Sequence, residues 1–158
     1  MKVNKYIKLA IFIIILLFAG FIGSIFTTPN IPTWYASLIK PVFNPPNWIF
    51  GPVWTILYIL MGIAAFLIWQ NGIKKKKVKV AIYIFAAQLF LNMLWSILFF
   101  GLQNPLLAFI EIIILWALIL LTIIKFSEIS KKAAYLLIPY ILWVSFAVIL
   151  NLFIYLLN

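Results

Sequence analysis

Five long apolar runs, separated by prolines, amides and lysines, constrain this chain more than any other feature. A helix needs about 20 apolar residues, within a range of about 17–25, to cross the hydrocarbon core of a bilayer. Each run reaches that range, and none shows the period-two alternation of β-barrel strands. The sequence therefore predicts an all-α integral membrane protein, a single domain over residues 1–158. Its five transmembrane helices are expected at about 9–26, 52–70, 80–100, 106–124 and 134–157.

Charged residues are too few for a surface in water. Only 9% of the chain is charged, whereas a soluble domain has about 25%. The sequence contains no Arg, His, Cys or Asp, which excludes disulfides, thiolate or imidazole metal sites, and Cys or His nucleophiles. The net charge of +10 would suggest nucleic acid as the partner of a soluble chain. Here the lysines flank apolar runs, so membrane lipids are the expected partner and nucleic acid is not.

The lysines fall on one side of a five-helix arrangement. They precede the first run or lie in the second and fourth loops, and Lys40 alone lies on the other side. The positive-inside rule then places the N-terminus in the cytoplasm, with the first loop and the C-terminus outside. The expected location is a prokaryotic cytoplasmic membrane. The lysines on the first side are Lys2, Lys5, Lys8, Lys74, Lys75, Lys76, Lys77, Lys79, Lys125, Lys131 and Lys132.

Prolines mark two further features. The first loop, about Thr28 to Pro52, holds six of the eight prolines, and since proline fixes φ this loop should be stiff. Long loops of this kind are commonly lids or binding loops, and resting on lipid headgroups is the alternative. Pro139 lies inside the fifth run, where it should kink the helix and free a carbonyl near Tyr135.

Amides and amphipathic aromatic residues occur at membrane depth in three runs. Their spacing of three or four residues puts Gln88, Asn92 and Trp95 on one helix face. Because an intramembrane amide is costly unless it is hydrogen-bonded, this face should point into the bundle or a cavity. Hydrogen bonding between helices, without a ligand, is the alternative for each amide. The same spacing joins Trp54 with Tyr58 in the second helix and Tyr140, Trp143, Ala147 and Asn151 in the fifth.

Together these groups would suit a flat hydrophobic ligand with a few polar edges. Glu111 is the sole acid within an apolar run. A structural role is expected for it ahead of proton transport, because no second acid, His or Arg offers a relay.

Four segments resemble the TspO/MBR family, whose members are called tryptophan-rich sensory proteins in bacteria and translocator proteins or peripheral benzodiazepine receptors in animals. The segments are WYASLIKP from Trp34, PPNWIFGPVWTILYILMGIA from Pro45, NMLWSILFF from Asn92, and PYILWVSFA ending at Ala147. The resemblance runs in order from about Trp34 to Asn151, and the first helix matches only in length and hydropathy.

This resemblance implies a homodimeric five-helix bundle whose first loop closes a pocket for porphyrins, haem precursors and synthetic aromatic ligands. No covalently attached cofactor and no metal ligand is expected. By motif, Trp54 and Trp143 would face the ligand, and Tyr35 and Pro45 would form the lid. Asn92, Trp95 and Ala147 would form the pocket wall. The sterol motif of animal members is incomplete, since no basic residue follows Tyr155. The candidate ligand-binding residues are Tyr35, Pro45, Trp54, Tyr58, Gln88, Asn92, Trp95, Tyr140, Trp143 and Ala147.

The leading prediction is a membrane receptor, sensor or carrier for porphyrin-type tetrapyrroles. One alternative is light- and oxygen-dependent porphyrin breakdown, in which the resemblance implicates Trp54 and Trp143; the other is small-molecule transport. The pocket contains no conventional acid, base or nucleophile, so a conventional enzyme is not expected. Small residues of the first helix, Ala19 with Gly23 and Gly20 with Ser24, would suit either a dimer surface or packing inside the bundle.

Overall fold

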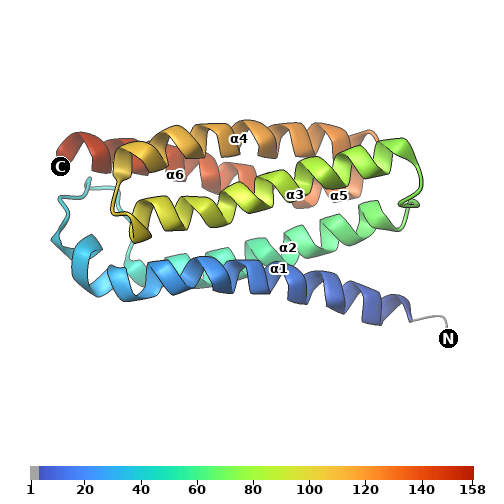
Figure 1. The fold of residues 1–158 in the computed structure, drawn as a ribbon, viewed down its shortest axis with the longest axis horizontal. Coiled ribbons are helices and arrows are strands. Elements are labelled where there is room, and N and C mark those ends of the chain that lie inside the picture. The colour runs from blue at the N-terminus through green and yellow to red at the C-terminus, as the bar shows by residue number, and fades with distance from the viewer. Residues whose placement is uncertain (1–3) are drawn as a thin grey trace.

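The computed structural model describes residues 4–158, and all regular structure in that range is helical. Five helical stretches are long and apolar enough to cross a membrane, and they run side by side along the long axis of the bundle (Figure 1). The predicted five-helix bundle is confirmed. The helices are α1 (Lys5–Thr27), α2 (Phe50–Trp69), α3 (Lys76–Ser96), α4 (Pro105–Ser127), α5 (Lys131–Leu136) and α6 (Ile138–Leu157).

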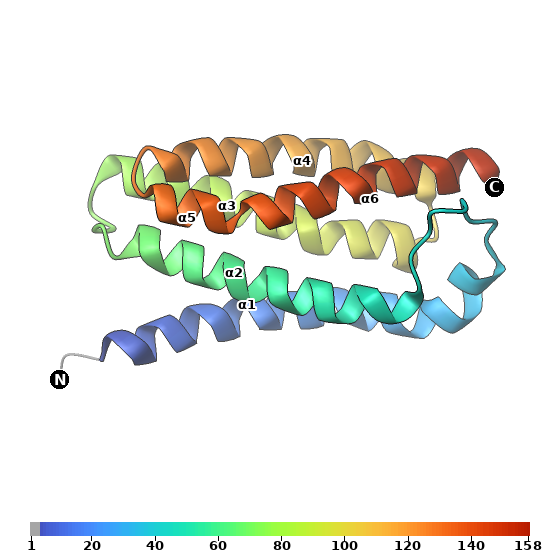
Figure 2. The same ribbon diagram turned by 180° about the vertical axis from the view of Figure 1, so that it is seen from behind.

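The helices close into a ring. α1 packs against α2 and α3, α2 packs against α5, and α4 packs against α3, α5 and α6. The two ends of the chain lie at opposite ends of the bundle (Figures 1 and 2), as an odd number of crossings requires. The connections α2–α3 and α4–α5 lie at the same end as the N-terminus, so their lysines share one end (Figure 1). Lys2 lies outside the described residues.

The first connection is shorter than expected. α1 continues directly into a 3-10 turn, η1 (Thr28–Asn30), and a π-helical turn, η2 (Ile31–Tyr35). Pro29 and Pro32 each occupy one of the first two positions of these turns, where an N–H is not needed. A second 3-10 turn, η3 (Asn47–Ile49), precedes α2. Short helical turns therefore occupy both ends of the connection expected from Thr28 to Pro52, and irregular chain is confined to residues 38–46.

This irregular segment is held against the end of α6. The Asn158 side chain accepts a hydrogen bond from Ile39 N–H and donates one to Ile39 C=O, each at 2.9 Å. The ring of Phe43 packs against Phe146 and Phe153, with centroid distances of 6.3 and 5.3 Å. The segment is thus fixed at both its backbone and a side chain, in agreement with a stiff connection.

The fifth predicted helix is two helices. α5 ends at Leu136 and α6 begins at Ile138, with Pro139 in the first turn of α6. Leu137 N–H bonds to Ala134 C=O at 3.0 Å and closes α5. Together α5 and α6 form one stretch, Lys131–Leu157, that is long and apolar enough to cross a membrane, as predicted for 134–157. The kink expected near Pro139 is a break between α5 and α6.

The small residues of α1 face the inside of the bundle. A Cβ atom built on Gly20 would lie 2.5 Å from the Tyr58 ring, and one on Gly23 would lie 3.2 Å from Ser96 Oγ. Ala19 is also buried. For these residues the structure shows the alternative that the sequence left open, packing inside the bundle, because their small size serves close approach of α1 to α2 and α3. The homodimer itself stays a prediction.

Candidate ligand-binding cavity

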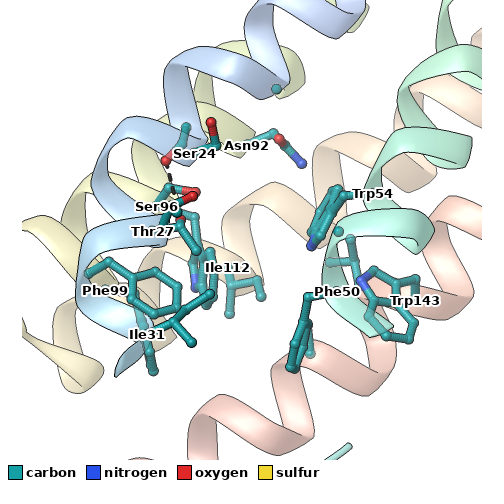
Figure 3. Close-up of a pocket in the computed structure, with 18 of the residues that line it drawn as sticks. Ser24, Thr27, Ile31, Phe50, Trp54, Asn92, Ser96, Phe99, Ile112 and Trp143 are labelled. Carbon is teal, nitrogen blue, oxygen red and sulfur yellow. Dashed lines mark hydrogen bonds between the residues drawn. The ribbon is translucent and has the colours of Figure 1, made fainter. Parts of the chain in front are cut away.

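A cavity of about 410 Å³ lies between α1, α2, α3, α4 and α6 (Figure 3). This volume falls within the range of about 300–1,000 Å³ typical of small-molecule sites. Within residues 4–158, no charged side chain lines it. The sequence predicted a site between the second, third and fifth helices, and the structure adds α1 and, through Ile112 and Leu115, α4.

Seven of the ten predicted residues line this cavity. The other three do not: Pro45 is half-buried in the irregular segment, and Gln88 and Tyr140 lie buried behind the wall. Contact of any of the ten with a ligand stays a prediction. The seven are Tyr35, Trp54, Tyr58, Asn92, Trp95, Trp143 and Ala147.

A chain of hydrogen bonds connects the cavity wall to the deeper interior. The Tyr58 hydroxyl donates to Asn92 Oδ1. Asn92 Nδ2 donates to the Tyr140 hydroxyl at 2.9 Å, and that hydroxyl donates to Gln88 Oε1 at 2.8 Å. All four residues are buried, and Gln88 Nε2 has no partner within the described range. The two amides of α3 therefore form hydrogen bonds that connect α3 to α2 and α6. Hydrogen bonding between helices was the alternative to ligand binding for them.

Aromatic rings form two opposed walls of the cavity. On one side the rings of Trp54 and Tyr58 lie 5.7 Å apart, and Phe50 packs edge-on against Trp143 at 6.0 Å. These separations are typical of favourable aromatic pairs. Figure 3 shows Trp54, Phe50 and Trp143 together on the side of α2 and α6.

On the other side Trp95 stacks on Phe99 with centroids 4.9 Å apart. The Trp95 indole N–H donates to Asn151 Oδ1 at 3.0 Å, and Asn151 Nδ2 donates to Pro105 C=O at 2.8 Å. Asn151, which the sequence placed on one face with Trp143, thus holds α6 against α3 and the start of α4. Trp95 keeps only its ring face for a ligand.

Sequence reasoning missed the contribution of α1. Gly20, Ser24 and Thr27 line the cavity, and Ser24 and Thr27 lie opposite the tryptophans (Figure 3). The available signal was the spacing of small residues in this helix, which indicates a close approach but does not say to which neighbour. Phe50 and Phe99 are further lining residues that were not predicted.

Two residues with ionisable side chains, Glu111 and Lys40, lie outside the cavity. Glu111 is buried on α4, its two carboxyl oxygens have no partner among residues 4–158, and it does not line the cavity. The Lys40 ammonium lies 4.9 Å from the centre of the Tyr35 ring and donates to Leu38 C=O at 2.9 Å. Neither side chain lines the cavity.

Comparison with known proteins identifies the family. The family model described as the TspO/MBR family matches residues 12–157. The chain belongs to the TspO/MBR family. Within it, the tryptophan-rich protein TspO of Chlorobaculum tepidum is 48% identical over 156 residues, which cover 98% of this chain and 99% of that protein. The TspO protein of Archaeoglobus fulgidus is 50% identical over 153 residues, covering 96% and 97%.

Similarity within the TspO/MBR family extends to animals. The translocator protein of Ovis aries is 38% identical over 133 residues, which cover 84% of this chain and 79% of that protein. The family match includes most of α1, for which the sequence motifs offered only length and hydropathy. The whole cavity, with its α1 wall, therefore lies inside the matched region.

Proposed function

We propose that this TspO/MBR-family protein is a membrane receptor, sensor or carrier that binds porphyrin-type tetrapyrroles and similar flat hydrophobic ligands. The observation that carries the proposal is the cavity itself, walled by aromatic rings and, within the described residues, free of charged side chains. A flat apolar ligand would bury its faces against these rings, and aromatic stacking adds about 0.5–1.5 kcal/mol per ring pair.

Titration with protoporphyrin tests this function. The protein in lipid nanodiscs is titrated in the dark, and quenching of tryptophan fluorescence reports binding. Trp143→Ala removes a large part of the wall and should weaken binding by about 1–3 kcal/mol. Trp48→Ala is the matched control, since Trp48 is 73% exposed and does not line the cavity. Unchanged affinity in both Trp54→Ala and Trp143→Ala would refute the placement.

Uptake of labelled porphyrin by proteoliposomes separates a carrier from a receptor. A carrier accumulates porphyrin in the lumen, whereas a receptor binds it without such uptake. A small-molecule transporter would also move unrelated solutes.

The cavity tryptophans favour a second candidate function, light-dependent porphyrin breakdown. The indoles of Trp54 and Trp143 line the cavity, so an excited porphyrin held there, with molecular oxygen as the oxidant, would lie at contact distance from both. The expected result is stable binding in darkness and loss of the porphyrin absorption band only under light and oxygen. Bleaching by Trp54→Phe and Trp143→Phe at the wild-type rate would count against this activity.

We also propose that the lysine-rich end faces the cytoplasm. The described lysines of the α2–α3 and α4–α5 connections share the end of the N-terminus (Figure 1), as the positive-inside rule requires. Val42→Cys and Asn71→Cys place single cysteines at opposite ends of this cysteine-free chain. An impermeant maleimide should label position 42 on intact cells and leave position 71 unlabelled. The reverse pattern would overturn this orientation.

A further inference from the structure

The cavity reaches the molecular surface on the side of α1 and α2. Among the residues that line it, those that come after α2 in the chain are all buried or half-buried within the described range 4–158. Every exposed lining residue belongs instead to the first two membrane-crossing stretches, Lys5–Tyr35 and Asn47–Trp69. The opening therefore lies between these two stretches. The exposed lining residues are Phe21, Thr28, Asn47, Gly51 and Thr55.

The opening has a closed inner end and free space near its outer end. At the inner end α1 touches α2, since a Cβ atom built on Gly20 would lie 2.5 Å from the Tyr58 ring. At Gly51, about two helical turns earlier in α2, a built Cβ atom would meet nothing within 4 Å. Figure 3 shows Thr27 of α1 across the cavity from Trp54 of α2. The opening thus extends from the level of Tyr58 to the start of α2.

Most of this opening faces lipid chains. Phe21 and Thr55 lie inside stretches that are long and apolar enough to cross a membrane, so they lie at the depth of the hydrocarbon core. The exposed ring of Phe18 stacks on that of Phe21 with centroids 6.3 Å apart and adds to the apolar border. Thr28 and Asn47 follow α1 and precede α2, at the polar headgroup level. The opening is therefore apolar inside the bilayer and polar at its outer end.

The other approach to the cavity, past the first connection, is fastened. Tyr35 lines this end of the cavity and is buried, and its hydroxyl donates to Asn44 Oδ1 at 2.7 Å. The Asn158 side chain forms two hydrogen bonds with the backbone of Ile39. None of residues 36–46 lines the cavity. Entry here would break these hydrogen bonds, whereas no hydrogen bond among the described residues joins α1 to α2.

From these features we propose that ligands enter and leave the cavity between α1 and α2, directly from the lipid bilayer. The inference rests on the proposed binding of flat hydrophobic ligands, which concentrate in the bilayer because transfer of apolar surface out of water is favourable. Such a ligand passes with its apolar body at the level of Phe21 and Thr55 and its polar edge at the level of Thr28 and Asn47. The first connection stays closed throughout.

Substitution of Gly51 tests this route by its effect on rates. Gly51→Phe adds a ring where the structure has free space, so it should obstruct the opening without displacing the backbone. Protoporphyrin binding to the protein in nanodiscs is followed in the dark by stopped-flow quenching of tryptophan fluorescence, and release by transfer to excess empty nanodiscs. Both rates should fall about tenfold, while the dissociation constant changes far less, because the obstruction acts in both directions. Ile56→Phe is the matched control, since Ile56 is exposed on the same helix and does not line the cavity.

Two further variants separate the two possible routes. Phe21→Ala removes a ring from the border of the opening and should raise both rates about threefold. Phe18→Ala is its matched control, because both rings are 60% exposed on α1 but only Phe21 lines the cavity. Asn158→Ala removes both hydrogen bonds to Ile39 and should leave the rates unchanged, because the first connection is not the route.

The outcomes separate this inference from the proposed function. Faster association in Asn158→Ala, with wild-type rates in folded Gly51→Phe, would overturn the inference in favour of entry past the first connection. Wild-type rates in both Gly51→Phe and Phe21→Ala, or equal effects in these variants and their controls, would overturn it as well. In each of these cases protoporphyrin still binds and the proposed function stands. A wild-type protein that binds no protoporphyrin would refute the proposed function, and this inference with it.

Discussion

The two halves of the bundle are built from similarly apolar helices but pack differently. In the half that contains the lysine-rich end, here called the packed half, Ala64, Ala81 and Ala133 are fully buried and bring the helices together. In the other half, here called the cavity half, the large side chains of Trp54 and Trp143 stand beside small residues such as Gly51 and Ala147, and the helices enclose a cavity. Similar hydropathy is therefore compatible with different packing in the two halves.

Two glycines of α2 show this difference within one helix. A Cβ atom built on Gly62, in the packed half, would lie 2.8 Å from Ile13 Cα and 3.1 Å from Ile13 N. One built on Gly51, in the cavity half, meets nothing within 4 Å. α2 is thus in backbone contact with α1 at Gly62, whereas Gly51 faces open space. Tyr58, between these positions, begins the hydrogen-bonded chain that closes the cavity on its inner side.

The substitution Gly62→Ala should break the packed half. The added Cβ meets backbone atoms that cannot rotate away, so overpacking should cost about 3 kcal/mol of stability. Gly51→Ala is the matched control in the same helix and should be neutral or slightly stabilising. Thermal unfolding in one detergent, followed by circular dichroism, compares the two variants. Equal melting temperatures would show that the close approach of α1 and α2 is not a determinant of the packed half.

Removal of one hydroxyl should weaken the boundary between the halves. Tyr140→Phe leaves Asn92 Nδ2 and Gln88 Oε1 without their partner in the interior, which should cost about 2 kcal/mol. Tyr58→Phe removes a single hydrogen bond and should cost less. The same thermal unfolding assay ranks the two. A larger loss for Tyr58→Phe would mean that the chain is not anchored at Tyr140.

Simple signals in the sequence predicted the five membrane-crossing helices and the residues on the tryptophan side of the cavity. Continuous apolar runs show where helices cross, and a spacing of three or four residues puts Asn92 and Trp95 on one face. Such a pattern reveals faces within one helix. It does not tell which amide meets which hydroxyl, so the bonding of Gln88 to Tyr140 could not be predicted.

The α1 side of the cavity and the end of α1 were beyond these signals. Ser24 and Thr27 satisfy their own helix, and their spacing resembles that of any small-residue stripe. Pro29 and Pro32 indicate a loop by local preference, yet each falls in the first turn of a short helical segment where proline is tolerated. The cavity-lining role of Ser24 and Thr27 and the helical turns after α1 become visible only when the neighbouring helices are packed together.

Replacement of the buried acid in the cavity half should stabilise the protein. Glu111 is 7% exposed, and neither carboxyl oxygen has a partner among the described residues. Glu111→Met removes this unpaired polar group and should raise stability by about 1 kcal/mol. Porphyrin affinity should not change, because Glu111 does not line the cavity. Glu111→Gln, which keeps a polar group, is the control. A loss of stability in Glu111→Met would show that the carboxyl group has a structural partner.

The smallest expected effect concerns the lysine-rich end of the packed half. Glu128 accepts a hydrogen bond from Lys125 Nζ at 2.7 Å. This bond, together with the nearby positive charge, lowers the pKa of the Glu128 carboxyl below its usual value. A lowered pKa means that the interaction stabilises the fold above the usual pKa of glutamate and is lost as the pH falls through the folded-state value.

Lys125→Gln should therefore raise the pKa of Glu128 toward that of a free glutamate, as measured by NMR titration of its carboxyl carbon. Both side chains are exposed, and exposed ion pairs contribute little to stability. The melting temperature should consequently change far less than in Gly62→Ala, although both positions belong to the packed half. Lys131→Gln is the control, since it removes a lysine from the same end without removing this hydrogen bond. An equal change of the Glu128 pKa in both variants would assign the shift to the general positive charge of this end and not to Lys125.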